Sequence, residues 1–278
     1  MAIASFLFAR SDSGAWRVRI EDIDRPRIVP GCAEEQLRAL SSYGLEPDGG
    51  VVRQSERMDL YDDAFDRLRR SGALYPCRCS RSEIAGTSSA PHGLEGPPYP
   101  GTCRDRDVDP AVARSWRFRV PADAVSFTDA IQGAQSQDVS WVVGDFVVRR
   151  EKPERSYAYQ LAVVVDDALQ GIERVVRGTD LLESTPRQIL LYRALDLEPP
   201  GFAHVPLLVA GEAGKLSKRA GAAAIASASS AVRHRIASSL LTAMGQAPDL
   251  TRAAATFSPE RIPRRREIQW EGVEAATR

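Results

Sequence analysis

The chain has 278 residues, 43% of them hydrophobic, and its 37 basic residues balance 37 acidic residues to give no net charge. This balance excludes a strongly basic protein that binds nucleic acid tightly and nonspecifically, so contact with a polyanion has to come from local patches. No segment approaches the roughly 20 apolar residues of a membrane span, and the apolar N-terminus lacks the basic stretch that opens a signal peptide. We therefore expect a cytoplasmic protein that is not attached to a membrane.

Residues 1–72 predict the first half of a Rossmann-like α/β domain. The first ten residues are typical of a helix, and the apolar alternation over residues 16–20 predicts a strand. This strand runs into an acidic loop that begins at Glu21 and stops at a proline. Ligands of open α/β sheets bind at the carboxyl ends of strands, so these carboxylates would hold an amino group or a ribose; the alternative is an ordinary acidic turn. Two helices are expected to follow, over residues 34–43 and 59–70.

Residues 73–154 differ in composition from the segments on either side. They are rich in cysteine, proline, glycine and small polar residues, and short strands are predicted over residues 116–120 and 141–149. We interpret this segment as an insertion into the α/β domain.

Three of the four cysteines gather in this insertion, at Cys77, Cys79 and Cys103. Three thiolates and one further ligand satisfy tetrahedral zinc, and a metal explains a C-x-C cluster in such a chain better than disulfides do. Tyr99 and His92 are the candidates for the fourth ligand. Cys32 lies apart, and we expect it to be a small buried hydrophobic residue.

Residues 155–219 return to the pattern of an α/β domain. The valine run that ends in Asp166 and Asp167 does not alternate, which predicts a strand buried on both faces. A second β-branched run ends in Arg177 beside Gly178, where a guanidinium is well placed to bind a carboxylate through two hydrogen bonds. The apolar spacing over residues 185–195 predicts a helix.

The loop Lys215 to Arg219 (KLSKR) carries the strongest chemical signal. Two lysines that flank a small hydroxyl residue can hold the phosphates of ATP and neutralise the charge that develops when pyrophosphate leaves. The alternative for an isolated basic loop is a solvated surface. Residues 220–278 begin with an Ala/Ser-rich stretch and a helix to about Met244, which predicts a small helical module.

Together these motifs resemble one family, the glutamyl-Q tRNA(Asp) synthetases, which are shortened relatives of the class I glutamyl-tRNA synthetases. The resemblance extends to about Ala220 and implies a Rossmann-like class I catalytic domain with a zinc-binding insertion that approaches the tRNA. Within it, Lys215 to Arg219 matches the variant of the class I "KMSKS" loop, in which Lys218 contacts ATP. The family's glutamate-binding positions fall on Glu21, Tyr159 and Arg177. Its zinc ligands fall on Cys77, Cys79, Tyr99 and Cys103.

One element of the family is not found in the sequence. The "HIGH" element and the Arg-x-Ala-Pro-Ser stretch of the first strand have no match, and residues 1–10 resemble the helix that normally follows them. We expect that the first strand of this fold is missing from residues 1–278. Two interpretations compete: a start assigned too late, which we favour, and a true truncation that has lost adenylation.

The resemblance implies an ATP-dependent ligase that makes glutamyl-adenylate and transfers glutamate to the queuosine of tRNA(Asp). Lys215 and Lys218 would stabilise the departing charge, Mg²⁺ would bridge the ATP phosphates, zinc would be structural and the protein a monomer. Two alternatives remain. A catalytically silent tRNA-binding homologue would not bind ATP, and a truncated glutamate–tRNA(Glu) ligase would use a different acceptor.

Overall fold

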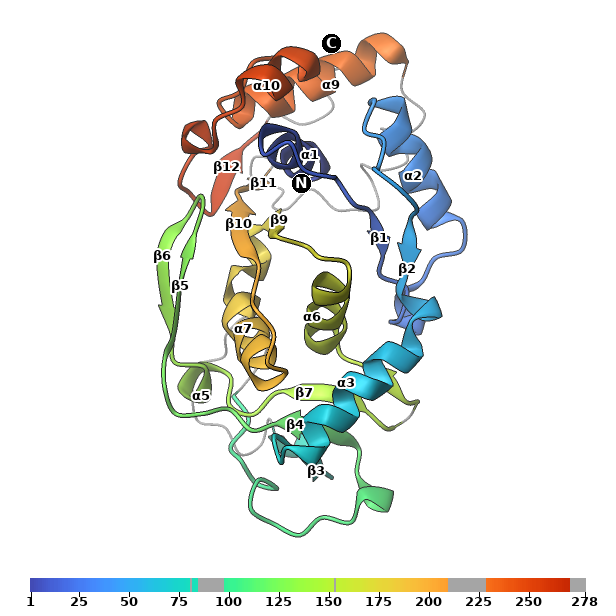
Figure 1. Cartoon of the computed structure of the whole chain (residues 1–278), viewed down its shortest axis with the longest axis vertical. Coiled ribbons are helices and arrows are strands. Elements are labelled where there is room, and N and C mark those ends of the chain that lie inside the picture. Colours follow the sequence, from blue (N-terminus) through green and yellow to red (C-terminus); the bar gives the residue numbers. More distant parts are fainter. Residues whose placement is uncertain (81, 85–97, 153, 210–228, 271–278) are drawn as a thin grey trace.

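The computed structural model describes residues 1–80, 82–84, 98–152, 154–209 and 229–270. The described part is an elongated α/β molecule, with the N-terminal helix and the C-terminal helices at one end and a small antiparallel sheet at the other (Figure 1). Among the described helices, none combines the length and the apolar character needed to cross a membrane.

The N-terminal part contains a parallel βαβ unit. Strand β1 (Arg19–Ile20) pairs in parallel with β2 (Val52–Arg53), and helix α2 (Cys32–Ser42) lies between them in the chain. Helix α1 (Ala2–Ser11) precedes this unit and α3 (Met58–Arg70) follows it. The predicted strand and all three predicted helices of this segment are therefore confirmed, with small changes at their ends.

Helix α3 shows why the sequence pattern was informative in this segment. Its buried residues Tyr61, Ala64, Phe65 and Leu68 recur every three or four positions and form one apolar face. Asp59 lies in the first turn and three arginines lie in the last turn, so the charges also complement the helix dipole.

The central sheet has four strands in the order β6-β5-β10-β9. Strand β10 (Gly201–Val205) is parallel to both of its neighbours, β9 (Arg174–Gly178) and β5 (Val125–Asp129). Strand β6 (Gly133–Gln137) closes one edge as the antiparallel partner of β5. Residues 125–137 lie within the predicted insertion, yet they belong to the same sheet as the strands of the following segment.

The prediction of a strand at the valine run is wrong, because this run forms helix α6 (Tyr159–Leu169). Every residue from Gln160 to Asp167 is buried, so the helix lacks the polar face that normally reveals helical periodicity. Tertiary packing overrides the β preference of valine in this environment. The neighbouring helix α7 (Thr185–Ala194) is also buried along most of its length, and its prediction is confirmed.

The other end of the molecule holds an antiparallel sheet in the order β3-β4-β7-β8. The predicted strand over residues 141–149 is only partly correct, since its first part is the helical turn α5 (Val139–Val142), capped by the Asp138 side chain. The strands are β3 (Leu74–Cys77), β4 (Ser115–Phe118), β7 (Val147–Arg150) and β8 (Ser156–Tyr157).

The C-terminal part contains two helices and one strand. Helices α9 (Ser230–Ala243) and α10 (Leu250–Thr256) pack with α1, and Leu7 and Leu241 are fully buried between them. The predicted helical module also contributes a strand, because β12 (Glu267–Gln269) pairs in parallel with β11 (Leu207–Val209).

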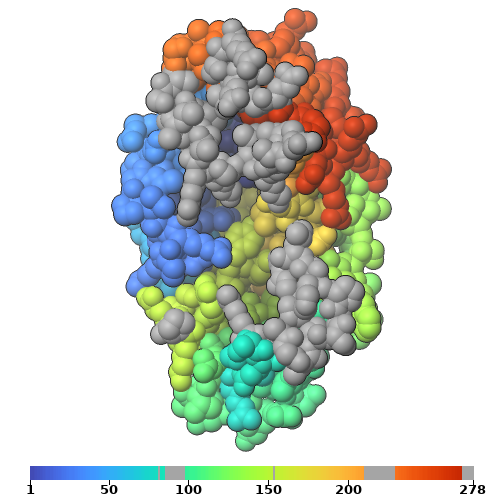
Figure 2. Space-filling model, turned by 180° about the vertical axis from the view of Figure 1, so that it is seen from behind, coloured from blue at the N-terminus to red at the C-terminus, as the bar shows by residue number. Residues whose placement is uncertain are grey.

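The largest apolar core lies between α3, α6, α7 and the antiparallel sheet. Phe65 of α3 meets Trp116 of β4 edge to face, with ring centroids 5.3 Å apart, and the Arg149 guanidinium lies 3.5 Å from the Phe65 ring centroid. This core packs α6 beside the carboxyl ends of β1 and β9, which it contacts through Asp167 and Tyr159. In Figure 2 the olive surface of the α6 region is set back between the blue N-terminal part and the gold segment.

Candidate functional site

Two of the three predicted glutamate-binding side chains are in contact, although they come from different elements. Arg177 lies in β9 and Tyr159 is the first residue of α6. Their closest polar atoms, Arg177 Nη1 and Tyr159 Oη, are 3.4 Å apart. Glu21 follows β1 and is near enough for its charge to act on Tyr159. Burial raises the pKa of Tyr159, Arg177 lowers it, and Glu21 adds to the increase.

Most of the Arg177 guanidinium is engaged by the protein itself. Its Nε–H donates to His204 Nε2 at 2.9 Å, and Nη2 donates to Thr185 Oγ1 at 2.8 Å and to the carbonyl oxygen of Leu181 at 3.3 Å. Arg177 is only 6% exposed, and no carboxylate of the described residues lies within 4 Å of it. Nη1 therefore remains, on the side of Tyr159, as the nitrogen that can bind an external group.

Glu21 belongs to a cluster of charged side chains in which Arg19 lies between three carboxylates. Arg19 donates to Glu21 at 3.2 Å and to Asp167 at 2.7 Å, and its Nε lies 3.6 Å from Asp166. Burial raises the pKa of Asp167, although Arg19 and Arg177 oppose this effect. Glu21 keeps 40% of its side chain exposed, yet desolvation still raises its pKa against the attraction of Arg19. A carboxylate in this position can bind an incoming cation.

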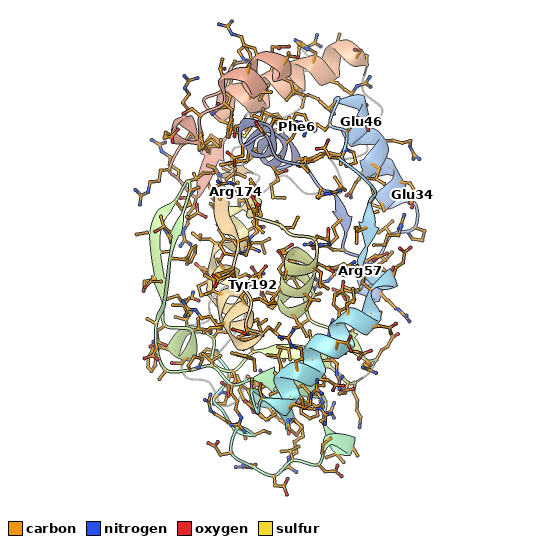
Figure 3. The ribbon with its side chains drawn as sticks, viewed as in Figure 1. Phe6, Glu34, Glu46, Arg57, Arg174 and Tyr192 are labelled. Carbon is orange, nitrogen blue, oxygen red and sulfur yellow. The ribbon has the colours of Figure 1, made fainter. Side chains whose placement is uncertain are left out.

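Asp166 anchors this group to α3. It is fully buried and accepts hydrogen bonds from Gln54 at 2.8 Å, Arg57 at 2.6 Å and Tyr61 at 2.8 Å. Figure 3 shows Arg57 and Tyr192 on either side of α6, from which Asp166 projects. The carboxylate thereby fixes α6 relative to α3 and supports the position of Tyr159.

The predicted zinc ligands also lie together. The Sγ atoms of Cys77, Cys79 and Cys103 all lie within 4.8 Å of one another, and those of Cys79 and Cys103 are 3.5 Å apart. Tyr99 Oη is 3.4 Å from the sulfur of Cys77 and 3.8 Å from that of Cys79. Sulfur ligands at about 2.3 Å from a tetrahedral zinc are separated by about 3.8 Å, so these four donors fit such an ion.

The thiols of this cluster differ in the direction of their pKa shifts. Burial raises the pKa of Cys79 to about 11. Burial alone would raise the pKa of Cys103 as well, but hydrogen bonds from the Arg78 backbone, Tyr99 and Cys79 lower it. The cluster therefore offers one thiol that ionises more readily than usual, and a metal ion would displace the remaining protons.

The backbone and a buried arginine fix Tyr99 within the cluster. The Tyr99 N–H donates to Val143 O at 2.9 Å, and Gly144 has φ +69°, where a Cβ would collide with the Tyr99 carbonyl group. Arg117 lies with its guanidinium 3.7 Å from the Tyr99 ring centroid and donates from Nε to Cys77 Sγ at 3.3 Å. Such outer contacts orient the ligands of metal sites.

Several predicted residues cannot be compared with the structure. Lys215 and Lys218, with the rest of the loop to Arg219, lie outside the described residues, as does His92. Cys32 is described, and its prediction as a buried residue is wrong. It lies half-buried at the start of α2, where its sulfur accepts a hydrogen bond from Gln36.

The sequence interpretation missed the residues that support Arg177, namely His204, Thr185 and Asp129. His204 stands in the middle of the buried strand β10, and a polar residue in an apolar strand was the available signal. Nothing in the sequence indicated that the Asp129 side chain contacts the His204 ring.

Comparison with known proteins shows the family of this chain. Residues 1–235 match the model of the "tRNA synthetases class I (E and Q), catalytic domain". A glutamyl-Q tRNA(Asp) synthetase of Geobacter sulfurreducens is 46% identical over 277 residues, which cover 94% of this chain and 87% of the relative. One of Chromobacterium violaceum is 50% identical over 224 residues, with coverage of 81% and 74%.

The fold is also similar to solved structures of glutamate–tRNA ligases. The ligase of Elizabethkingia meningosepticum, solved in complex with its amino acid, gives a TM-score of 0.77 at 23% identity, and that of Elizabethkingia anophelis gives 0.78 at 22%. The match covers 99% of this chain but only 64% and 65% of those chains, so this chain spans just under two thirds of their length. The predicted fold class and resemblance are confirmed. The chain belongs to the class I tRNA synthetases (E and Q), among relatives named glutamyl-Q tRNA(Asp) synthetase.

Proposed function

We propose that this chain activates L-glutamate with ATP to give glutamyl-adenylate and pyrophosphate, and then transfers the glutamyl group to the queuosine of tRNA(Asp). The names of relatives that are 46% and 50% identical support this substrate pair. Class I synthetases use ATP with Mg²⁺, and Lys215 and Lys218 would stabilise the charge that develops on the leaving pyrophosphate.

The buried, unpaired charge of Arg177 carries the proposal. A guanidinium that is 6% exposed and has no described carboxylate within 4 Å, with Asp167 acting on it only at longer range, is costly unless an anion binds there. The side-chain carboxylate of glutamate is the natural partner, because the α-carboxylate has to attack the phosphate of ATP. The geometry favours a single contact through Nη1, with a second hydrogen bond from Tyr159, rather than the two-pronged contact we expected from the sequence.

Glu21 and its neighbours would bind the ammonium group of the substrate glutamate. Its carboxylate would pair with the substrate ammonium group, while Arg19 holds it in place at 3.2 Å. Protonation of Glu21 would remove this charge, and because burial raises its pKa, ammonium binding would be lost at a higher pH than with an ordinary glutamate.

We further propose a structural zinc ion on Cys77, Cys79, Tyr99 and Cys103. Soft thiolates favour zinc among the common divalent ions, and the spacing of the four donors fits tetrahedral coordination. Four protein ligands leave no open position for a substrate, so zinc would stabilise this end of the molecule without taking part in the reaction.

The function can be tested in two assays. The first follows the glutamate-dependent exchange of labelled pyrophosphate into ATP, and the second follows the transfer of labelled glutamate to tRNA(Asp) with and without queuosine. We expect exchange and transfer to the modified tRNA alone. Transfer to tRNA(Glu) would instead indicate an ordinary glutamate ligase, and the absence of ATP binding would indicate a silent tRNA-binding homologue.

A pair of variants tests the role of Arg177. Arg177→Gln should raise the KM for glutamate by about 10- to 100-fold, because a hydrogen bond to a charged group contributes about 1.5 to 3 kcal/mol. Arg174→Gln is the matched control, since Arg174 lies on the same strand but is exposed and pairs with Asp12. An unchanged glutamate requirement in Arg177→Gln removes this residue from the site.

A further inference from the structure

Behind Arg177 lies a buried chain of hydrogen bonds that the proposed reaction does not use directly. Arg177 Nε donates to His204 Nε2 at 2.9 Å, and His204 Nδ1 lies 2.6 Å from Asp129 Oδ2. His204 is fully buried and Asp129 is 2% exposed. The three residues come from the adjacent strands β9, β10 and β5, so the chain crosses the sheet perpendicular to its strands.

The geometry fixes the protonation of the His204 ring. An arginine Nε–H can only donate, so Nε2 must accept and the ring proton lies on Nδ1, facing Asp129. Burial lowers the pKa of His204, Asp129 opposes this and the positive charge of Arg177 adds to it, so the ring is neutral. A protonated ring would lose its acceptor and repel the guanidinium.

The turn between β5 and β6 holds the Asp129 carboxylate in place. Its Oδ1 accepts from the backbone N–H of Ile131 at 3.0 Å, Gln132 at 2.7 Å and His204 at 3.1 Å. Burial alone would raise the pKa of Asp129, but the hydrogen bonds from His204 and from these backbone groups lower it. All described partners of this carboxylate are therefore fixed by the backbone or by His204.

We propose that His204 and Asp129 are positioning residues that aim Arg177 at the carboxylate of the amino acid substrate. This inference rests on the proposed function, in which Arg177 binds glutamate. A carboxylate in direct contact with Arg177 would neutralise the charge that the substrate needs. The neutral imidazole instead orients the guanidinium, while the anion of Asp129 stays one ring away and fixes the tautomer.

The isosteric variant Asp129→Asn tests this arrangement. Three backbone N–H groups point at Oδ1, so the amide oxygen has to occupy that position and the NH₂ group has to face His204. The ring proton then moves to Nε2, which can no longer accept from the Nε–H of Arg177 and has only Thr185 Oγ1, at 3.3 Å, as an acceptor. We expect the KM for glutamate in pyrophosphate exchange to rise by about 10- to 100-fold, with the KM for ATP unchanged.

Two substitutions of His204 separate positioning from folding. The amide of glutamine reaches the place of Nε2 and can accept from Arg177, whereas that of asparagine reaches only the place of Nδ1. His204→Gln should therefore keep the KM for glutamate within a few-fold of the wild type, and His204→Asn should raise it as Asp129→Asn does. Equal KM values in these two variants would overturn the proposal, whatever their stability.

NMR with ¹⁵N-labelled histidine and arginine gives a readout that does not depend on activity. The chain has three histidines, so the ring nitrogens of His204 can be assigned by comparison with the variant. We expect the Nδ1–H tautomer and a slowly exchanging Arg177 Nε–H in the wild type, and loss of both in Asp129→Asn. If the wild type activates no glutamate, the proposed function fails. An Nε2–H tautomer in the wild type refutes the positioning role, whether or not glutamate is activated.

Discussion

Substitution of Asp166 by asparagine should strongly destabilise the protein. Asp166 is fully buried and accepts three hydrogen bonds of 2.6 to 2.8 Å, from Gln54, Arg57 and Tyr61. Asparagine keeps one acceptor oxygen but directs an NH₂ group at the remaining donors, and it removes the negative charge next to Arg57 and Arg19.

The size of the effect follows from these contacts. Removing one partner of a buried ion pair costs about 3 to 5 kcal/mol, because the other charge remains buried without compensation. The arginines of this group are only 15% and 19% exposed, so solvent can replace the lost charge only in part. We therefore expect the free energy of unfolding to fall by about 3 kcal/mol or more, a large share of the roughly 5 to 15 kcal/mol typical of a domain.

Urea unfolding followed by circular dichroism measures this change. The control is Asp105→Asn, the same chemical change in a surface ion pair, since Asp105 is 88% exposed and lies 3.4 Å from Arg119. Exposed pairs of this kind contribute little, so the control should unfold like the wild type. If Asp166→Asn unfolds within about 1 kcal/mol of the control, the buried network does not hold α6 as we have argued.

Two further predictions concern the metal cluster and the dependence of stability on pH. Arg117→Met should weaken zinc binding by about 10- to 100-fold, because it removes the contacts to Cys77 and to the Tyr99 ring. Competition with a chromophoric chelator measures the zinc affinity, and an unchanged affinity would contradict this prediction. Burial lowers the pKa of His204 below its ordinary value of 6.5, so its contribution to stability is complete above pH 6.5 and is lost as the pH falls from there toward the lowered value. Wild type should therefore lose more stability than His204→Gln between pH 7.5 and 5.5 in urea titrations, and parallel losses would refute this assignment.

The resemblance assigned Tyr159 and Arg177 to one glutamate site, which stays a prediction, and the structure brings the two side chains into contact. The valine run beside Tyr159 was nevertheless predicted as a strand and is a helix. The reason is burial on all sides, which removes the polar positions by which a helix and a strand differ in sequence.

Local and compositional features could be predicted from the sequence. These are the strand that ends before Glu21, the strand that carries Arg177, the amphipathic helix α3 and the C-x-C cluster, because each depends on periodicity or on ligand types that are close in the chain.

The support of the candidate site depends on contacts between residues that are far apart in the chain. His204 and Asp129 are 75 residues apart in the chain, and Asp166 meets Tyr61 across 105 residues. Such pairs depend on which strands become neighbours and on how a helix is turned against them, and no local pattern of one sequence records this. The number of Arg177 N–H groups left for a ligand is likewise set by these distant partners, because each nitrogen that the protein satisfies is no longer available to an external group.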